Sequence, residues 1–463
     1  MALVESFSGI RGIYGESLTD AVAIKYAYAY LLFLRKKSKK SSLTIVIGRD
    51  TRPSGENLRN SILSILDCSF IEAGIASTPA VQFAVRHFNA DGGIILTASH
   101  NEPYWNGLKF LGKDGALVSE ADSCQIIQNF KVGSLRDFHK IRERKFTNRI
   151  AETRSGYIGF LKEVIGNEGI SKIRHSGQRI LLDANGGTGS ISKDILKEFG
   201  AEAIGVNMEP GEFNRKVAPT EESMSCLKNL IDESKADFAA GFDCDADRLG
   251  IVLKDGTYLP GDYILALVVS CVLSHGRKKR AYVVVNDATS GLVKDVVQSF
   301  GAKIKEVEVG EVNVVSEMDR LKAVAGGEGS SGGAIITPSK CRDGMLSLLM
   351  IMLLIAKNGK KIEELTNELP KYFTLSSNIE YNKPNYNSIK KFIKGYYTKK
   401  GFKIQETGGI LGGLKVNIAD KSFVWFRASK TEEGVFRVIA DSNSRDTAKS
   451  LMDEALRIFH NNI

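Results

Sequence analysis

Three aspartates, Asp243, Asp245 and Asp247, stand at alternating positions directly after an apolar segment. Buried carboxylates are costly unless a cation neutralises them, and carboxylate oxygens in a tight loop suit a magnesium ion. The loop does not continue as a calcium-binding EF-hand, because Arg248 and Lys254 stand where that loop has glycine and glutamate. The pattern predicts a divalent-metal site, with a solvated acidic turn as the alternative.

A serine also follows an apolar segment: Ser99 lies in TASHN, beside His100 and ahead of Lys109. A serine in this position can be a nucleophile if a base or a metal activates it. A helix cap or a turn explains such a serine more often when the loop is taken alone. The loop therefore gains meaning only together with the other motifs.

A glycine-rich segment, residues 326–333, contains one acid, Glu328. Within it, residues 329–333 match GxSxG, the nucleophile elbow of α/β-hydrolases, which must lead into a helix. Residues 334–338 predict a strand instead, so the match is accidental. Close approach of this loop to hydroxyl groups is the better interpretation.

Arginine, lysine and hydroxyl side chains follow the apolar segment that ends at Phe426, namely Arg427, Ser429, Lys430 and Thr431. An arginine fork with neighbouring hydroxyls is suited to clamping a phosphate, although a polar hairpin has a similar composition. No P-loop sequence is present, which argues against a P-loop nucleotide site. Near the N-terminus, Arg11 stands in GIRG, where glycines permit close approach to a ligand or simply form a surface turn.

The elements that must position these loops alternate along most of the chain. Strands are expected at 43–48, 93–97, 179–183, 236–242, 282–286 and 323–326, and helices at 190–199 and 221–234. Such alternation predicts α/β domains with parallel or mixed sheets. The last part of the chain predicts strands around one helix, closed by a helix at 447–459.

We expect four domains with boundaries near residues 150, 252 and 369. They comprise 1–150 with the serine loop, 151–252 with the aspartate loop, 253–369 with the glycine-rich loop, and 370–463 with the arginine loop. The first three are predicted to be related α/β domains and the last an α+β domain. Ligands gather at the carboxyl ends of strands in open α/β sheets, so the four loops are expected to converge on a central cleft.

Composition fits a multidomain globular protein of 463 residues, with 43% hydrophobic and 25% charged residues. The apolar run 345–356 is too short to span a bilayer and predicts a buried helix. Six scattered cysteines without a CxxC pair predict reduced, mostly buried thiols. The net charge of +9 includes basic clusters at 35–40 and 277–280, which we interpret as solvated helix ends or turns rather than a nucleic-acid site.

Five motifs occur in an order that resembles the α-D-phosphohexomutase superfamily. They are GIRG, TASHN with NGLK, DCDADR, a GE-containing loop and RASKT. The resemblance covers essentially the whole chain, and TASHN together with DxDxDR is a specific combination. It implies the same four-domain fold around a central cleft, with a C-terminal domain that can close over it.

The resemblance also implies roles for the matching residues. Ser99 would carry a phosphoryl group, and its phosphate would join Asp243, Asp245 and Asp247 around Mg²⁺. The groups surrounding the transferring phosphoryl would be Arg11, His100, Lys109 and Arg248. Sugar hydroxyls would be bound by Glu328 with Ser330 or Ser331, and the non-reacting phosphate by Arg427, Ser429, Lys430 and Thr431.

Three departures from the family pattern leave the sugar open. Glu102 stands where proline usually follows TASHN, and Gly333 stands where a histidine is common. The segment 309–312 lacks the usual arginine or lysine. The glycine-rich loop is closer to the variant of archaeal-type members.

The implied activity is that of an isomerase-class phosphotransferase, which interconverts hexose 1-phosphate and hexose 6-phosphate through a hexose 1,6-bisphosphate. Mannose, glucose and glucosamine phosphates remain candidates. The expected cofactors are Mg²⁺ and the bisphosphate as activator, and the expected partner is a small phosphosugar, with no nucleic acid and no membrane. The protein is expected to be cytoplasmic, as a monomer or homodimer. A non-catalytic phosphosugar-binding protein and a phosphosugar phosphatase are the alternatives.

Overall fold

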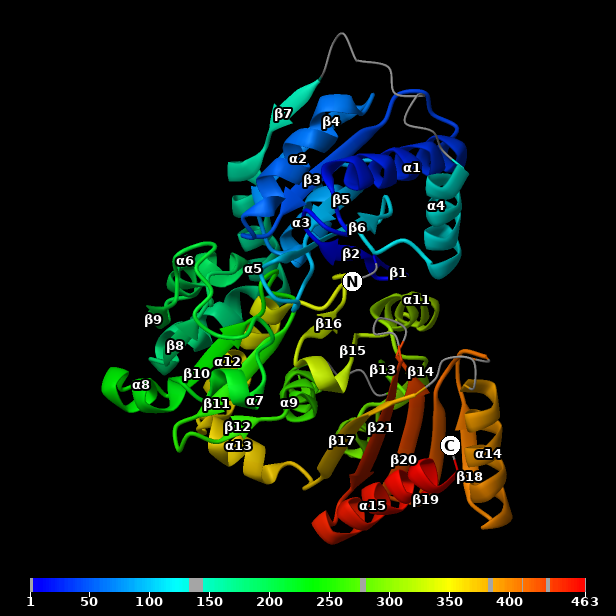
Figure 1. Cartoon of the computed structure of the whole chain (residues 1–463). Coiled ribbons are helices and arrows are strands. Elements are labelled where there is room, and N and C mark those ends of the chain that lie inside the picture. Colours follow the sequence, from blue (N-terminus) through cyan, green and yellow to red (C-terminus); the bar gives the residue numbers. More distant parts are fainter. Residues whose placement is uncertain are drawn as a thin grey trace. The chain divides into compact units, whose positions relative to one another are not determined.

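The structure, a computed structural model, describes residues 3–132, 145–274, 280–381, 386–409, 411–429 and 434–462 (Figure 1). The chain forms two compact units, Met1–Pro260 with Gly332–Ile362, and Gly261–Ser331 with Glu363–Ile463. Each unit is therefore assembled from two separate stretches of sequence.

The first unit opens with a seven-stranded mixed sheet of order β1-β2-β6-β5-β3-β4-β7. Its strands are β1 (Val4–Ser6), β2 (Gly9–Ile13), β3 (Thr44–Arg49), β4 (Ser69–Ile75), β5 (Gly92–Leu96), β6 (Trp105–Leu111) and β7 (Phe146–Asn148). Strand β3 runs parallel to β4 and β5, whereas β6 runs antiparallel to β2 and β5.

Four helices accompany this sheet: α1 (Asp20–Ser38), α2 (Ser54–Ile65), α3 (Thr78–His87) and α4 (Glu120–Val132). Tyr26 and Tyr30 of α1 join Ile45 and Ile47 of β3 in one buried apolar cluster. Every residue of β5 is buried, as expected for a strand covered on both faces, and this explains its continuous apolar run. The strands predicted at 43–48 and 93–97 are confirmed as β3 and β5.

The second sheet of this unit has the order β12-β11-β10-β8-β9. Its strands are β8 (Arg179–Asp183), β9 (Glu202–Val206), β10 (Phe238–Phe242), β11 (Leu249–Leu253) and β12 (Tyr258–Leu259). The accompanying helices are α5 (Ile150–Ser176), η2 (Thr188–Ile191), α6 (Ser192–Glu198), α7 (Glu221–Met224) and α8 (Leu227–Ser234). The helix predicted at 221–234 is thus two helices, and α5 contains a break at Gly166, whose φ is 74°.

The apolar run 345–356 lies within helix α12 (Gly344–Asn358), which contacts α5 and β11 and is buried along almost its whole length. This confirms the expected buried helix. Strand β16 (Ala334–Ile336) precedes it, where the sequence predicts a strand after GxSxG. Among the described helices, none has both the length and the hydropathy that a bilayer-spanning segment needs.

The second unit contains the parallel strands β13 (Tyr282–Asn286), β14 (Lys303–Val307) and β15 (Ala325–Gly327). Their helices are α9 (Gly261–Ser274), α10 (Gly291–Ser299) and α11 (Glu311–Leu321), with a short η3 turn at Gly329–Ser331. The strand predicted at 282–286 is confirmed. Helix α13 (Ile362–Glu368) leads to the C-terminal part.

The C-terminal part is a five-stranded antiparallel sheet of order β17-β21-β20-β19-β18. Its elements are β17 (Phe373–Glu380), α14 (Tyr386–Lys399), β18 (Lys403–Glu406), β19 (Leu414–Ala419), β20 (Ser422–Ala428), β21 (Val435–Ser442) and α15 (Arg445–Asn462). Both helices share one apolar core with the sheet (Figure 1). The predicted α+β arrangement and closing helix are confirmed.

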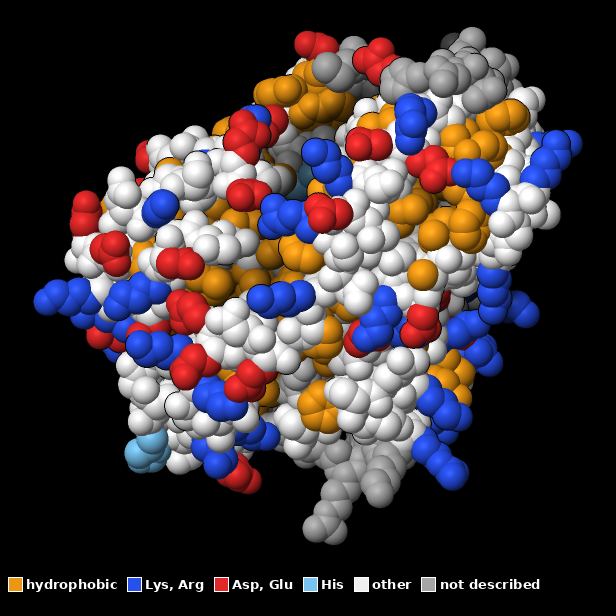
Figure 2. Space-filling model, turned by 90° about the horizontal axis from the view of Figure 1, so that it is seen from below, with side chains coloured by type: hydrophobic (Ala, Val, Ile, Leu, Met, Phe, Trp, Pro, Cys, Tyr) orange, Lys and Arg blue, Asp and Glu red, His pale blue; other side chains and the backbone are white. Residues whose placement is uncertain are grey.

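The exposure of the cysteines corrects one expectation, and the exposure of the first basic cluster confirms another. Only three of the six cysteines are buried, since Cys124 and Cys226 are exposed and Cys68 is half-buried. The basic cluster at 35–40 lies at the end of α1 and just beyond it and is mostly exposed, as expected, whereas residues 277–279 of the second cluster lie outside the described residues. Basic and acidic side chains are interspersed over most of the face in Figure 2.

Asp343 connects helices α12 and α5, next to Gly344, whose amide contacts the aspartate loop at Ala246. It is fully buried, caps α12 by accepting the Leu346 amide at 2.9 Å, and accepts the Tyr157 hydroxyl of α5 at 2.8 Å. Burial raises its pKa to about 6. The start of α12 is therefore fixed to α5 through one carboxyl group.

We expect Asp343→Ala to lower the free energy of unfolding by about 2–4 kcal/mol, because it removes a helix cap and leaves a buried hydroxyl without its partner. Denaturant titration of the purified protein measures this loss. Thr220→Ala, which removes the side-chain cap of the short helix α7, is the matched control and should cost about 1 kcal/mol. Equal losses in the two variants would contradict the special role of Asp343.

Candidate functional site

Ser99 lies in the loop between β5 and β6, directly beyond the end of a fully buried strand. Its side chain is buried, and its φ of 54° places it in the left-handed region. Its amide donates to Thr97 Oγ1 at 2.9 Å. A non-glycine residue in this conformation is costly and persists only where its surroundings hold it. The loop is therefore a constrained one.

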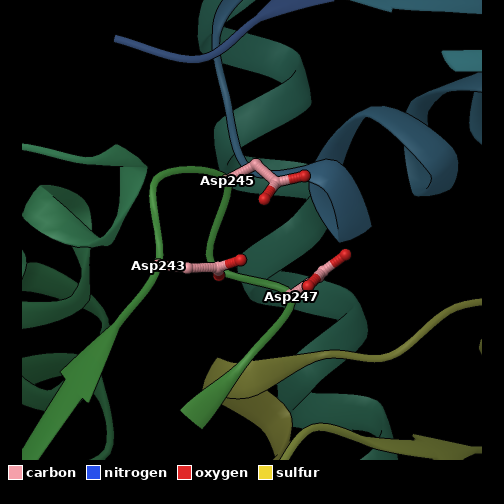
Figure 3. Close-up of side chains that lie close together, drawn as sticks. All are labelled: Asp243, Asp245 and Asp247. Atoms are coloured by element: carbon pink, nitrogen blue, oxygen red, sulfur yellow. The ribbon is translucent and has the colours of Figure 1, made fainter. Parts of the chain in front are cut away.

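The aspartate loop joins the antiparallel strands β10 and β11. The Ala246 amide donates to the Asp243 carbonyl at 3.1 Å, and Ala246 has a φ of 53°. This tight turn places the three aspartates on one short loop, as Figure 3 shows. One carboxylate oxygen from each lies within 4.8 Å of the others. The expected loop geometry is confirmed.

Helix α3 receives the aspartate loop at its N-terminus. The Thr78 amide donates to the Asp245 carbonyl at 2.9 Å, and the Thr78 hydroxyl donates to Asp245 Oδ2 at 2.5 Å. The positive end of a helix dipole favours a negative charge there. The Ser99 hydroxyl in turn donates to Asp243 Oδ2 at 3.2 Å. The serine loop and the aspartate loop thus meet directly.

Cationic side chains compensate the buried carboxylates. Lys109 Nζ of β6 contacts Asp245 Oδ2 at 2.6 Å and Asp247 Oδ2 at 3.3 Å. Arg342 Nη2, from the segment before α12, lies 3.2 Å from Asp247 Oδ2. Arg248 Nε lies 3.8 Å from Asp243 Oδ2. The cluster is therefore a network of opposite charges contributed by separate parts of the unit.

The surrounding charges and burial shift the pKa values of Asp243 and Asp247 in opposite directions. Burial and then the neighbouring Asp247 and Asp245 charges raise the pKa of Asp243 to about 8. Burial alone would also raise the pKa of Asp247, but Arg342, Lys109 and Arg248 outweigh it and hold that pKa below its ordinary value. The loop therefore holds one carboxyl that tends to keep a proton beside one that stays ionised.

The donor set fits a hard divalent cation. Among the described side chains, buried atoms without a hydrogen-bond partner include Asp245 Oδ1 and Asp247 Oδ1. Buried carboxylate oxygens normally find a donor or a cation, and oxygen ligands are those that Mg²⁺ prefers. The three residues are also the only group of three potential ligands within the described residues.

Arg11 and His100 lie in the same neighbourhood. Arg11 Nη1 of β2 donates to Asn101 Oδ1 at 3.0 Å, and burial lowers the pKa of Arg11 to about 10. The Arg248 charge, followed by burial and Arg11, holds the pKa of His100 well below its ordinary value. His100 is therefore neutral at pH 7. All four residues expected around Ser99, namely Arg11, His100, Lys109 and Arg248, lie in this one unit.

The residues expected to bind sugar and phosphate lie in the second unit. Glu328 Oε1 accepts from Asn286 Nδ2 at 3.0 Å and from the Gly310 amide at 2.9 Å. Ser330 is exposed, and the side chain of Ser331 lies outside the described residues. The glycine-rich loop is thus tied to the ends of β13 and β14 through its acid.

Arg427 belongs to strand β20 rather than to the loop after it, because the β20–β21 ladder continues through Ala428. Its Nη2 atom contacts Glu308 Oε1 at 2.9 Å, and both side chains are largely buried. The Ser429 amide donates to the Val435 carbonyl at 2.8 Å. Lys430 and Thr431 lie outside the described residues.

Sequence reasoning missed Thr78, Arg342 and Arg52, which contact the two loops from distant positions. Thr78 follows Ser77, which caps α3. The sequence serine–threonine–proline is typical of a helix start and could have indicated one here. Arg342 and Arg52 carried no local signal, because their partners are far away in the sequence. Contacts of this kind become visible only in the folded unit.

Three family profiles match the chain. They describe phosphoglucomutase/phosphomannomutase alpha/beta/alpha domain I at residues 5–136, domain II at 155–256 and domain III at 260–373. A phosphoglucomutase/phosphomannomutase of Thermococcus kodakarensis is 33% identical, over 97% of each chain. A phosphoglucosamine/phosphogalactosamine mutase of Sulfurisphaera tokodaii is 27% identical, also over 97% of each chain.

Solved structures share the fold. Parafusin, a phosphoglucomutase of Paramecium, superposes with a TM-score of 0.82 at 19% identity, covering 98% of this chain and 94% of its own. The N-acetylphosphoglucosamine mutase of Aspergillus fumigatus, in complex with GlcNAc-6P and magnesium, gives 0.62 at 13% identity, covering 99% and 96%. The chain belongs to the phosphoglucomutase/phosphomannomutase family and is an enzyme.

The raised pKa of Asp243 would make metal binding at this loop depend on pH. Below pH 8 a metal ion bound by Asp243 would have to displace the proton that this carboxyl holds. We expect the affinity of the dephosphorylated protein for Mg²⁺ to rise about tenfold per pH unit between pH 6 and pH 7 and to level off above pH 8. Titration calorimetry in buffers of different ionisation enthalpy would report close to one proton released at pH 7.

Asp243→Asn is the control, because an amide has no proton to give up in this range. Its affinity for Mg²⁺ should be lower and should hardly vary with pH. An affinity of the unaltered protein that is constant from pH 6 to pH 8 would contradict the assignment of a proton to Asp243.

Proposed function

We propose that this enzyme interconverts hexose 1-phosphate and hexose 6-phosphate through phosphorylated Ser99 and a hexose 1,6-bisphosphate. The observation that carries the proposal is the 3.2 Å contact between Ser99 Oγ and Asp243 Oδ2 within a buried triad of aspartates. A serine that served only as a cap or a turn would not need a nucleophilic oxygen directed at a metal site. Family membership supports the reaction type but leaves the sugar open.

In the first step, the free hydroxyl of the bound sugar attacks the phosphorus carried by Ser99. The bond between phosphorus and Ser99 Oγ breaks, the hydroxyl proton passes to a protein base, and Ser99 regains a proton. In the second step Ser99 Oγ attacks the phosphorus of the other phosphate and gives its proton to a protein base. The bond between that phosphorus and the sugar oxygen breaks, the sugar oxygen takes up a proton, and the isomeric monophosphate leaves. Phosphoryl transfer of this kind depends mainly on positioning and charge stabilisation.

Asp243, Asp245 and Asp247 would hold Mg²⁺ beside the phosphate of Ser99. When bound, the ion would neutralise charge on the oxygens of the transferring phosphoryl group. Lys109, Arg248 and Arg11 supply further positive charge around Ser99. His100 is neutral at pH 7, but the Arg248 charge that lowers its pKa also makes it a weaker base, so the group that accepts the hydroxyl proton is left open.

For substrate binding, we assign the sugar hydroxyls to Glu328 with Ser330 or Ser331. The non-reacting phosphate is assigned to Arg427 with Ser429, Lys430 and Thr431. The bisphosphate would have to reverse its orientation between the two steps, so this second set must accept either phosphate. The four-domain boundaries and a cytoplasmic location remain predictions from the sequence.

Ser99→Ala should reduce turnover by at least about a thousandfold, because the variant has no oxygen to carry the phosphoryl group. A coupled assay with glucose, mannose and glucosamine 1-phosphates, Mg²⁺ and catalytic bisphosphate measures the rate and the preferred sugar together. Ser155→Ala, an exposed serine on α5, serves as control and should behave like the unaltered protein.

Substantial mutase activity in Ser99→Ala would exclude the phosphoserine route. Release of inorganic phosphate in place of the isomeric sugar phosphate would indicate a phosphatase. Tight binding of the phosphosugars without any turnover in the unaltered protein would indicate a binding protein.

Arg427→Ala should raise KM for both the 1-phosphate and the 6-phosphate by about 10–100-fold, since a charge-assisted pair with phosphate is lost. Steady-state kinetics in both directions measure the change. Arg437→Ala provides the control, because Arg437 lies opposite Arg427 on the neighbouring strand β21 and is exposed. A normal KM for both substrates in Arg427→Ala would remove this residue from the phosphate site.

A further inference from the structure

The turn Asp50–Thr51–Arg52, between β3 and α2, is buried beside the serine loop. The side chains of Asp50 and Arg52 are fully buried, and Thr51 is nearly so. Arginine is rarely withdrawn from water unless its charge and its donors are satisfied. A fully buried arginine next to the reacting serine therefore calls for a specific reason.

The guanidinium of Arg52 is occupied by three acceptors. Nη1 forms an ion pair with the Asp50 carboxylate. Nη2 donates to the Ser99 carbonyl at 2.8 Å and also to the Asn101 carbonyl. Two carbonyls of the serine loop are thus held by one planar group, whose orientation is set by Asp50.

Asp50 is itself fixed to the scaffold. Its amide donates to the Leu96 carbonyl at the end of β5, at 3.0 Å, and its Oδ1 atom accepts the Arg52 amide at 2.9 Å. Thr51 reaches the other loop, with Oγ1 lying 3.6 Å from Cys244 Sγ. The same turn therefore contacts both the loop that carries Ser99 and the loop that carries the aspartates.

This arrangement bears directly on the serine. The left-handed φ of Ser99 must be maintained against its cost. Its amide is held by Thr97, and its carbonyl is held by Arg52. A rotation of the backbone at Ser99 would move Ser99 Oγ away from Asp243 Oδ2, from which it now lies 3.2 Å. Arg52 does not contact Oγ itself.

We propose that Arg52, oriented by Asp50, is a positioning residue for phosphoryl transfer, which fixes the backbone of Ser99 so that its oxygen faces the aspartate loop. The inference rests on the proposed function, since it requires Ser99 to be the residue that is phosphorylated. The role demands a guanidinium, because a lysine ammonium carries the charge but lacks the planar fork that reaches a carboxylate and two carbonyls together.

The test compares Arg52→Lys with the unaltered protein in steady-state and single-turnover assays. We expect kcat to fall by about 10–100-fold, because misplacement of a reacting group by about 1 Å has an effect of this size. KM should stay within about twofold, since no substrate-binding contact changes. The rate at which glucose 1,6-bisphosphate phosphorylates Ser99, followed by intact mass, should fall by the same factor as kcat.

Arg59→Lys is the matched control. Arg59 Nε of α2 also pairs with a carboxylate, Glu72 Oε2, at 2.6 Å, and its partners Glu72, Asn60 and Phe146 lie outside both loops. This variant should keep the kcat, KM and phosphorylation rate of the unaltered protein. Thermal unfolding and Mg²⁺ titration of each variant establish that the fold and the metal site are retained.

An Arg52→Lys protein that is folded and has an unchanged kcat would overturn the inference, and so would a rise in KM at constant kcat. If Arg52→Lys fails to fold, Asp50→Asn is tested in its place. For Asp50→Asn we expect a smaller fall in kcat at constant KM. An unchanged kcat in this variant would also overturn the inference. An unaltered protein that neither turns over nor becomes phosphorylated would overturn the proposed function as well.

Discussion

The burial of three carboxylates in one short loop is the constraint on which the rest of the site depends. Asp243, Asp245 and Asp247 are almost completely withdrawn from water, which is tolerable only if opposite charge surrounds them. That charge comes from β6, from the segment before α12 and from the N-terminus of α3. The packing of the first two sheets into one unit is therefore also the means by which the site is neutralised.

The sequence was most informative where chemistry is local. The aspartate loop and the serine loop are contiguous motifs after apolar strands, and their placement follows from the strand ends. Strands such as β8 and β13 were predicted with their observed bounds, because buried strands form continuous apolar runs. The convergence of the serine and aspartate loops was expected from their positions at strand ends, and the structure adds the contact itself, between Ser99 and Asp243.

The rest depended on contacts between distant positions. Arg52, Thr78 and Arg342 have partners far away in the sequence, so no spacing rule could single them out. The helix predicted at 221–234 divides in two, because apolar periodicity alone does not reveal where a helix is interrupted. Arg427 lies in a strand, because the ladder with β21 extends further than the apolar run.

In the second unit, the arginine assigned to phosphate already has an anionic neighbour. Arg427 is paired with Glu308, and both are largely buried. A phosphate that binds Arg427 would meet Glu308 as a like charge unless this pair opens. Phosphate binding would then weaken the contact between the C-terminal sheet and the β14–α11 connection, and that contact would in turn weaken phosphate binding.

The first unit is discontinuous in sequence, since residues 332–362 return to it after residues 261–331, which belong to the second unit. Arg342 and the apolar helix α12 arrive with this return. On the ribosome, the N-terminal sheets emerge long before these residues are made. Until then, the face of α5 that α12 later covers is exposed in the nascent chain, and the aspartate loop lacks the positive charge of Arg342. Chaperones that bind exposed apolar surface would act during this interval.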